Sequence, residues 1–268
     1  EGITRSHGMF LITGPTGSGK STTLYALLNL LNEEGVNIIT LEDPVEYYML
    51  GVNQSQVNPE VGLTFAAGLR SILRQDPDII MVGEVRDNET AALGVHAALT
   101  GHIVLSTLHT NDAIGAVPRL IDMKIEPFLL ASSLNVVMAQ RLVRRICPHC
   151  KQQMTLPPDT EKEVLAGLDG LPKASLPTDV SYKSPVTFFQ GQGCARCENT
   201  GYKGRVAISE VLEINDKMKK IIVSGGDLIE NIKQNFNSQG LYSMKQDGII
   251  KAMHGHTTVE EVLDATRS

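Results

Sequence analysis

A glycine-rich octapeptide near the start of the chain constrains the fold more than any other feature. Residues 14–21 read Gly-Pro-Thr-Gly-Ser-Gly-Lys-Ser and match the phosphate-binding pattern G-x-x-x-x-G-K-[S/T] completely. The apolar run Met9–Thr13 precedes the motif and a helical stretch, Thr22–Leu31, follows it. Because the motif requires this strand-to-helix context, a phosphate-binding loop is favoured over a glycine-rich turn without a ligand.

The loop predicts a nucleotide site. Its glycines let successive backbone N–H groups and the start of the helix wrap around phosphate oxygens. Lys20 adds a positive charge, and the Ser21 hydroxyl can hold Mg²⁺. The residues predicted to contact the nucleotide are Gly14, Pro15, Thr16, Gly17, Ser18, Gly19, Lys20, Ser21 and Thr22.

Apolar runs alternate with helical stretches through the first half of the chain, which is typical of βαβ units. The predicted strands are Met9–Thr13, Asn37–Leu41, Asp78–Val82 and His102–Ser106. In open α/β sheets, ligands bind at the carboxyl ends of the strands. The loops that follow these strands are rich in Gly, Glu, Asp, Arg and His, so we expect an α/β fold with an active site at that edge.

Acidic residues follow two of the predicted strands. Glu84 comes after the apolar run 79–82, which is the Walker B arrangement with a carboxylate facing Mg²⁺ or its water. Glutamate stands here where aspartate is more common. Glu42 occupies the end of the preceding predicted strand. A solvated surface carboxylate is the alternative for both residues.

Three arginines lie beside these elements: Arg70, Arg74 and Arg86. An arginine supplied across a subunit boundary can stabilise the charge of a phosphoryl-transfer transition state. A surface ion pair is the alternative for each of them.

Four cysteines form two C-x-x-C pairs, Cys147 with Cys150 and Cys194 with Cys197. Two such pairs can close a tetrahedral Zn–S₄ site, and a full set of four sulfurs indicates structural rather than catalytic zinc. Because no secretory signal is evident, metal is favoured over disulfides or unpaired thiols. Prolines interrupt the intervening segment, which we expect to be a small insertion held at its two cysteine ends.

Composition limits the partners. The formal net charge is -6, and dense basic sequence is confined to Arg141, Arg144 and Arg145, so nucleic acid is not the expected partner. The longest apolar stretch, Phe128–Ala139, is shorter than the roughly 18 residues of a membrane-spanning helix. We expect a cytoplasmic protein, and the absence of an initiator Met before Glu1 suggests a fragment.

The last third of the chain predicts a mainly helical region. A short strand, Arg205–Leu212, precedes three stretches with amphipathic spacing, Met218–Val223, Leu228–Phe236 and Val259–Thr266. The expected domains are an ATPase core (1–146), a tetracysteine subdomain (147–204) and a C-terminal helical subdomain (205–268).

Four segments together resemble the ATPases of type II secretion and type IV pilus assembly. They are the phosphate loop Gly14–Ser21, an acidic box Thr40–Glu46, the Walker B segment Ile79–Asp87 and a His box Ser106–Asp112. Their order matches the family's C-terminal motor domain, and the resemblance covers essentially the whole chain. It implies a RecA-like P-loop core with a zinc-binding insertion and a C-terminal helical region.

The resemblance also implies roles for single residues. Glu42 would polarise the attacking water, Glu84 would lie near Mg²⁺, and His109 would sense the γ-phosphate. The catalytic residues implied are Lys20, Glu42, Arg74, Glu84, Arg86 and His109. Retraction motors of this family generally lack the four cysteines, which favours assembly or export.

The resemblance implies a homo-hexamer that is peripheral on the cytoplasmic face of the inner membrane and docks on a platform protein of that membrane. An upstream domain of the family is absent from this chain. Two other functions compete with this one. A RecA-type DNA translocase or helicase is disfavoured by the charge balance, and a non-hydrolysing nucleotide-dependent scaffold is disfavoured by the intact Glu42 and Glu84.

Overall fold

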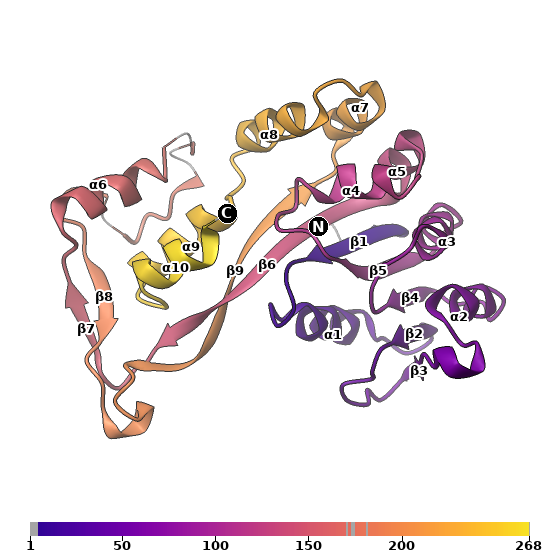
Figure 1. The fold of residues 1–268 in the computed structure, drawn as a ribbon, viewed down its shortest axis with the longest axis horizontal. Coiled ribbons are helices and arrows are strands. Elements are labelled where there is room, and N and C mark those ends of the chain that lie inside the picture. Colours follow the sequence, from indigo (N-terminus) through magenta and orange to yellow (C-terminus); the bar gives the residue numbers. More distant parts are fainter. Residues whose placement is uncertain (1–4, 170, 173–174, 181, 268) are drawn as a thin grey trace. The chain divides into compact units, whose positions relative to one another are not determined.

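A seven-stranded sheet, in the order β3-β2-β4-β5-β1-β6-β9, organises the fold (Figure 1). The computed structural model describes residues 5–169, 171–172, 175–180 and 182–267. The strands of the sheet are β1 (Gly8–Thr13), β2 (Ile38–Glu42), β3 (Val52–Gln56), β4 (Ile79–Val82), β5 (Ile103–Leu108), β6 (Leu134–Ile146) and β9 (Tyr202–Glu213). β1 pairs in parallel with β5 and β6, and β2, β3, β4 and β5 are joined by parallel pairs as well. The carboxyl ends of β1, β2, β4 and β5 therefore meet at one edge.

Helices connect these strands. They are α1 (Lys20–Leu31), α2 (Phe65–Ile72), α3 (Asn88–Leu99), α4 (Ala116–Asp122) and α5 (Pro127–Ser133), with a short 3₁₀ turn at Pro59–Val61. The side chain of Thr64 accepts the Ala67 N–H at the start of α2, and that of Asp87 accepts the Thr90 N–H at the start of α3. These caps fix where the two helices begin.

The core around the phosphate loop forms between α1 and the sheet. Leu24, Tyr25 and Leu28 of α1 pack in one buried cluster with side chains of β1, β2, β4 and β5. All four residues of β4 are buried, as is every residue of β2. Strands covered on both faces read as continuous apolar runs, which is why the sequence reveals them clearly.

A second core forms further along the chain. It contains the antiparallel pair β7 (Lys151–Met154) and β8 (Phe188–Gly191) and the helices α6 (Pro158–Ala166), α9 (Met244–Met253) and α10 (Val259–Thr266). Val164 and Phe188 are buried in one cluster with Ile249 and Val262. The remaining helices are α7 (Asp216–Ser224) and α8 (Leu228–Ser238), and a 3₁₀ turn spans Ala195–Cys197.

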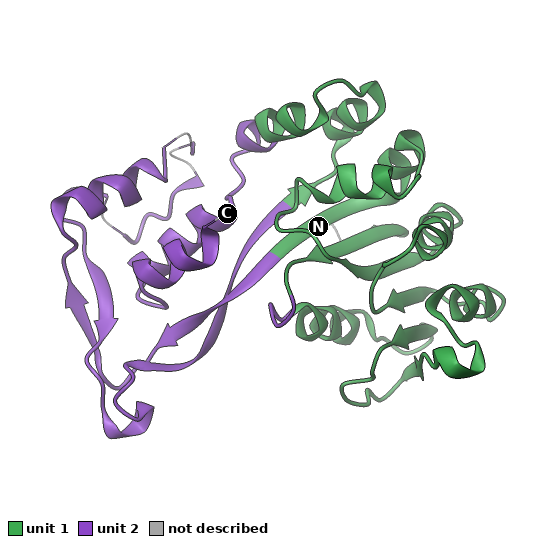
Figure 2. Cartoon of the chain, viewed as in Figure 1, with its two compact units in different colours: residues 1–15, 20–139, 212–235 green, residues 16–19, 140–211, 236–268 purple. Residues whose placement is uncertain are grey.

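The chain divides into two compact units (Figure 2). Unit 1 contains residues 1–15, 20–139 and 212–235, and unit 2 contains residues 16–19, 140–211 and 236–268. This division differs from the predicted segments 1–146, 147–204 and 205–268. The physical reason is the shared core of unit 2, in which α6 and β8 pack with α9 and α10.

The predicted secondary structure is confirmed at most positions and corrected at others. The four strands of the core, the strand after Gly204 and the three late helices are all present. The segment between the cysteine pairs is not held only at its two ends, because it contains α6 and contributes Val164 and Phe188 to the core of unit 2. β3 and β6 were not predicted. Within the described residues, no helix combines the length and apolarity that a membrane span needs.

Two leucines on α1 give a matched test of this packing. Leu28 is completely buried, whereas Leu30 is 67% exposed. Leu28→Ala should lower the free energy of unfolding by about 2–5 kcal/mol, because it removes buried methyl groups and leaves a cavity. Leu30→Ala should change it by less than about 0.5 kcal/mol. Urea denaturation followed by circular dichroism measures both, and equal effects would contradict the packing described for α1.

Candidate functional site

The phosphate loop joins β1 to α1 and adopts the backbone conformation that its glycines allow. Gly14, Gly17 and Gly19 have φ angles of 143°, 78° and 88°, a region that other residues rarely occupy. The Gln140 side chain donates to the Ser18 carbonyl at 2.8 Å. A Cβ atom at position 19 would lie 2.8 Å from the Gln140 amide nitrogen, so a side chain there would displace the Gln140 amide as well as strain the backbone.

Lys20, the first residue of α1, folds back over the loop. Its Nζ donates to the carbonyl oxygens of Gly14 at 2.8 Å and Pro15 at 2.9 Å. Burial lowers the pKa of the ammonium group below its usual range, and the negative charge of Glu84 offsets part of that effect. Ser21 and Thr22 follow as exposed residues in the first turn of α1. The arrangement leaves a lysine and a hydroxyl at the mouth of the loop.

Glu84 lies just past the end of β4 and collects positively charged neighbours. Its side chain is 12% exposed and forms an ion pair with Arg86, and it lies 3.2 Å from Nε2 of His109. Arg86 also approaches Asp43 at 3.9 Å, and the hydrogen bond to Glu84 is the main cause of the raised pKa of its guanidinium. Glu84 is thus the carboxylate around which the charged groups at this sheet edge gather.

Hydrogen bonds between neighbouring strands set the position of Glu84. The Ser106 hydroxyl donates to the Val82 carbonyl at 2.7 Å, and the Thr107 hydroxyl donates to the Gly83 carbonyl at 2.7 Å. The Val85 N–H donates to the carbonyl of Thr107 at 2.9 Å. Because β5 ends at Leu108, the next residue, His109, emerges beside Glu84.

Glu42 occupies a different environment at the end of β2. It is only 3% exposed. One carboxylate oxygen accepts from the Thr40 hydroxyl at 2.6 Å and from the Gln54 amide at 3.0 Å, and the other accepts from the Tyr25 hydroxyl. Neutral donors therefore hold this carboxylate, in contrast to the charged groups around Glu84.

The two arginines of the α2 region make their contacts elsewhere. Arg70 forms an ion pair with Glu89 of α3, and Arg74 donates to the Arg70 carbonyl at 2.9 Å. Over the ranges that the structure describes, neither is hydrogen-bonded to Glu84. Of the arginines predicted at the site, the structure brings only Arg86 to that carboxylate.

The residues that surround Glu42 belong to no sequence motif. Tyr25 looks like one more apolar position on an amphipathic helix, although a buried tyrosine hydroxyl needs a polar partner. Gln54 lies on β3, a short strand without an apolar run. The alternation Thr40-x-Glu42, which places both side chains on one face of a strand, was the only available signal.

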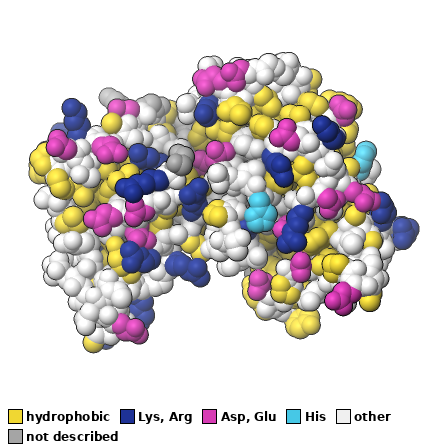
Figure 3. Space-filling view, viewed as in Figure 1, with side chains coloured by type: hydrophobic (Ala, Val, Ile, Leu, Met, Phe, Trp, Pro, Cys, Tyr) yellow, Lys and Arg dark blue, Asp and Glu magenta, His cyan; other side chains and the backbone are white. Residues whose placement is uncertain are grey.

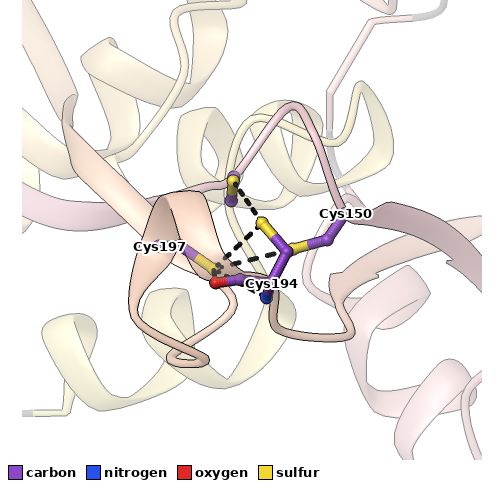
Figure 4. A group of neighbouring side chains, drawn as sticks. Cys150, Cys194 and Cys197 are labelled. Carbon is purple, nitrogen blue, oxygen red and sulfur yellow. Dashed lines mark hydrogen bonds between the residues drawn. The ribbon is translucent and has the colours of Figure 1, made fainter.

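The four cysteines come together in unit 2. All four Sγ atoms lie within 4.8 Å of one another. The separations are 4.0 Å for Cys147 and Cys194, 3.8 Å for Cys150 and Cys197, and 3.7 Å for Cys194 and Cys197. Figure 4 shows the sulfurs of Cys150, Cys194 and Cys197 turned toward one another. Four sulfurs around a tetrahedral zinc with Zn–S of about 2.3 Å would lie about 3.8 Å apart, so the donor set fits zinc.

The surroundings of two of these thiols shift their pKa values in opposite directions. Burial raises the pKa of the Cys197 thiol, but the N–H groups of Cys194 and Gly201 outweigh it and lower that pKa to about 6. Burial raises the pKa of the Cys150 thiol to about 12, and hydrogen bonds to the neighbouring thiols add to this effect. The sulfur separations exceed the roughly 2.05 Å of a disulfide, and all four cysteines are free.

Comparison with known sequences gives a consistent result. A family model described as "Type II/IV secretion system protein" matches residues 1–264. The chain is 51% identical over 267 residues to the type IV pilus assembly ATPase PilB of Myxococcus xanthus, covering 99% of this chain and 45% of that protein. It is 51% identical over 270 residues to type II secretion system protein E of Aeromonas hydrophila, covering 100% of this chain and 50% of that protein. The chain therefore spans about half the length of these curated relatives.

Comparison with solved structures supports the fold. The chain matches the pilus retraction motor PilT with bound ADP at a TM-score of 0.71 and 29% identity, over 100% of this chain and 64% of that one. The ATPase DotB of Legionella pneumophila matches at a TM-score of 0.68 and 24% identity, over 98% of this chain and 60% of that one. The predicted RecA-like P-loop fold is confirmed by these similarities.

Proposed function

The chain belongs to the family of type II/IV secretion system proteins, and on that premise we propose that it is the ATP-hydrolysing motor segment of a pilus-assembly or type II secretion machine. One observation carries the proposal. The phosphate loop, Glu42, Glu84 and His109 lie at the carboxyl edge of four adjacent parallel strands, β1, β2, β4 and β5. Binding and hydrolysis of a nucleoside triphosphate require these groups in one place.

Each residue has a role in this proposal. The loop N–H groups and Lys20 bind the phosphates, and Ser21 with Glu84 would hold Mg²⁺, which supplies positive charge to the phosphate oxygens. Glu42 orients the water that attacks the γ-phosphorus, so that the bond to the bridging oxygen breaks and ADP and phosphate form. His109, already beside Glu84, senses the γ-phosphate, and Arg86 neutralises charge there.

The machine is proposed from the relatives. Those compared above are a pilus assembly ATPase and a type II secretion protein, each about half identical to this chain. We propose a homo-hexamer at the cytoplasmic face of the inner membrane that acts on a platform protein. Arg70 and Arg74 lie on the surface outside the Glu84 cluster, which suits arginines that serve a neighbouring subunit.

A DNA translocase is the second candidate, and the surface argues against it. On the face drawn in Figure 3, Lys and Arg side chains are interspersed with Asp and Glu within each unit. A protein that binds a nucleic-acid backbone usually presents a continuous basic surface. A scaffold that binds nucleotide without hydrolysis is disfavoured because both carboxylates are intact and held in defined positions.

We also propose that the four cysteines bind structural zinc. The separations of the sulfurs and the low pKa of Cys197 support this assignment. Four thiolates complete a tetrahedral shell, which leaves no position for a reacting water. The metal would join the end of β6 to the turn at Ala195–Cys197.

Substitutions in the nucleotide site separate binding from turnover. Lys20→Ala should weaken MgATP binding by roughly 10–100-fold, because the phosphates lose a charged hydrogen-bond donor. Glu84→Gln and Glu42→Gln should keep most of the affinity and lose roughly 100-fold or more in turnover. Calorimetry and a phosphate-release assay measure the two effects. Normal hydrolysis by both Gln variants would show that the assigned carboxylate roles are wrong.

Metal content tests the cysteine site. The purified chain should contain about one zinc ion per protomer, and Cys194→Ser should lose most of it. The same variant should keep MgATP binding, because α1 and the strands beside it pack in a buried cluster that is separate from the core of unit 2. Elemental analysis measures the metal, with Ser209→Ala as a control for a substitution in unit 2 away from the sulfurs. Absence of metal from the purified chain would contradict the assignment.

Assembly should limit the rate of hydrolysis. An arginine donated across a subunit boundary is worth about 10³–10⁵ in rate, and assembly follows mass action. We expect turnover per protomer to rise with protein concentration, as light scattering detects larger species. Arg74→Ala should abolish this rise, whereas Arg205→Ala, at an exposed position in unit 2, should not. High, concentration-independent turnover by a monomer would rule out the cross-subunit role.

A further inference from the structure

The three donors to Glu42 come from two different parts of unit 1. Thr40 and Gln54 are directly paired residues on the neighbouring strands β2 and β3. Both donate to the same carboxylate oxygen, Oε1. The other oxygen, Oε2, accepts from Tyr25, which lies on α1. Tyr25 therefore connects Glu42 to a helix, whereas the other two donors lie on strands of the sheet.

That helix is the one that begins with Lys20. The Tyr25 hydroxyl also accepts the backbone N–H of Glu46 at 3.2 Å. One oxygen atom thus contacts both the carboxylate of Glu42 and the main chain of Glu46. Through this atom, α1 is hydrogen-bonded to both Glu42 and Glu46.

Burial fixes the Tyr25 hydroxyl in place. The residue is 2% exposed, and its ring packs edge-on against Tyr47 with the centroids 4.5 Å apart. Burial, followed by the hydrogen bond to Glu42, raises the pKa of the phenol to about 12. The hydroxyl therefore keeps its proton at physiological pH and remains available as a donor.

We propose that Tyr25 is a positioning residue that holds the Glu42 carboxylate in register with the phosphate-binding helix. The inference rests on the proposed function, in which Glu42 orients the attacking water. Without the Tyr25 donor, Oε2 would lose its partner in a buried site, and the carboxylate could rotate away from the direction that hydrolysis requires. Nucleotide binding does not need this contact, because Lys20 and the N–H groups of the loop bind the phosphates in this proposal.

The phenylalanine variant isolates the hydroxyl. Tyr25→Phe keeps the buried ring and its contact with Tyr47. We expect kcat to fall roughly 10–100-fold, the scale of a hydrogen bond to a charged group. KM and the calorimetric Kd for MgATP should stay within about twofold, because the change acts on the hydrolytic step alone. Tyr47→Phe is the matched control, since it removes a hydroxyl from the adjoining, half-exposed ring without touching Glu42.

A double-mutant cycle tests whether Tyr25 acts through Glu42. In single-turnover measurements, Tyr25→Phe should slow the wild-type chain but not the Glu42→Gln variant. A further loss in the Glu42→Gln background would overturn the proposal, and so would an unchanged kcat for Tyr25→Phe when Glu42→Gln is impaired. Normal turnover by Glu42→Gln would instead reject the role of Glu42 in the proposed function.

A donor-preserving replacement guards against a packing artefact. Incorporation of 4-aminophenylalanine at position 25 keeps an N–H donor at the end of the ring, and it should restore at least part of the turnover that phenylalanine loses. Thermal unfolding of each variant shows whether the fold is retained. If the amino variant is folded but as slow as phenylalanine, the hydrogen bond to Glu42 is not the cause and the proposal fails.

Discussion

Parallel hydrogen bonding around β1 is the constraint on which the candidate site depends. β1 pairs with β5 on one side and β6 on the other, and β5 pairs with β4, which pairs with β2. Because the strands run in the same direction, their carboxyl ends reach one edge together. The phosphate loop, Glu42, Glu84 and His109 come from four separate stretches of sequence, and only this ladder brings them to the same place.

The two carboxylates at that edge are held by opposite means. Glu84 is surrounded by cations or potential cations, namely Arg86, His109 and the nearby Lys20. Glu42 is surrounded by neutral hydroxyl and amide donors in a buried site. Two carboxylates in such different surroundings can take different chemical roles. A bound ion would change the contacts of Glu84, because charged neighbours hold that carboxylate. The position of Glu42 would change only if its neutral donors moved.

Sequence motifs predict candidate residues for a nucleotide site, but they carry no signal for the residues that hold those candidates in position. The phosphate loop, Glu84 and the cysteine pairs carry patterns fixed by short spacing, so single-sequence reading finds them. Tyr25 and Gln54 have no such pattern, because their roles depend on tertiary contacts with Glu42. β6 lacks a continuous apolar pattern for a different reason: polar residues such as Asn135, Gln140 and Arg141 interrupt it. Val164 and Ile249 share one buried core, although they are far apart in the sequence. This long-range packing is why the two compact units do not follow continuous segments of the chain.

The two compact units are interleaved along the chain, each built from three separate segments. Residues 212–235 complete unit 1, although the middle of unit 2 has been synthesised before them. Unit 2 in turn begins within the phosphate loop, at residues 16–19, and is completed by residues 236–268. Unit 1 is therefore unfinished until most of unit 2 has been synthesised, unlike an N-terminal domain that folds before the next domain emerges. The buried cluster around α1 nevertheless draws only on residues from Ile12 to Leu105, so this core can form early, whereas α7 and most of α8 join unit 1 late.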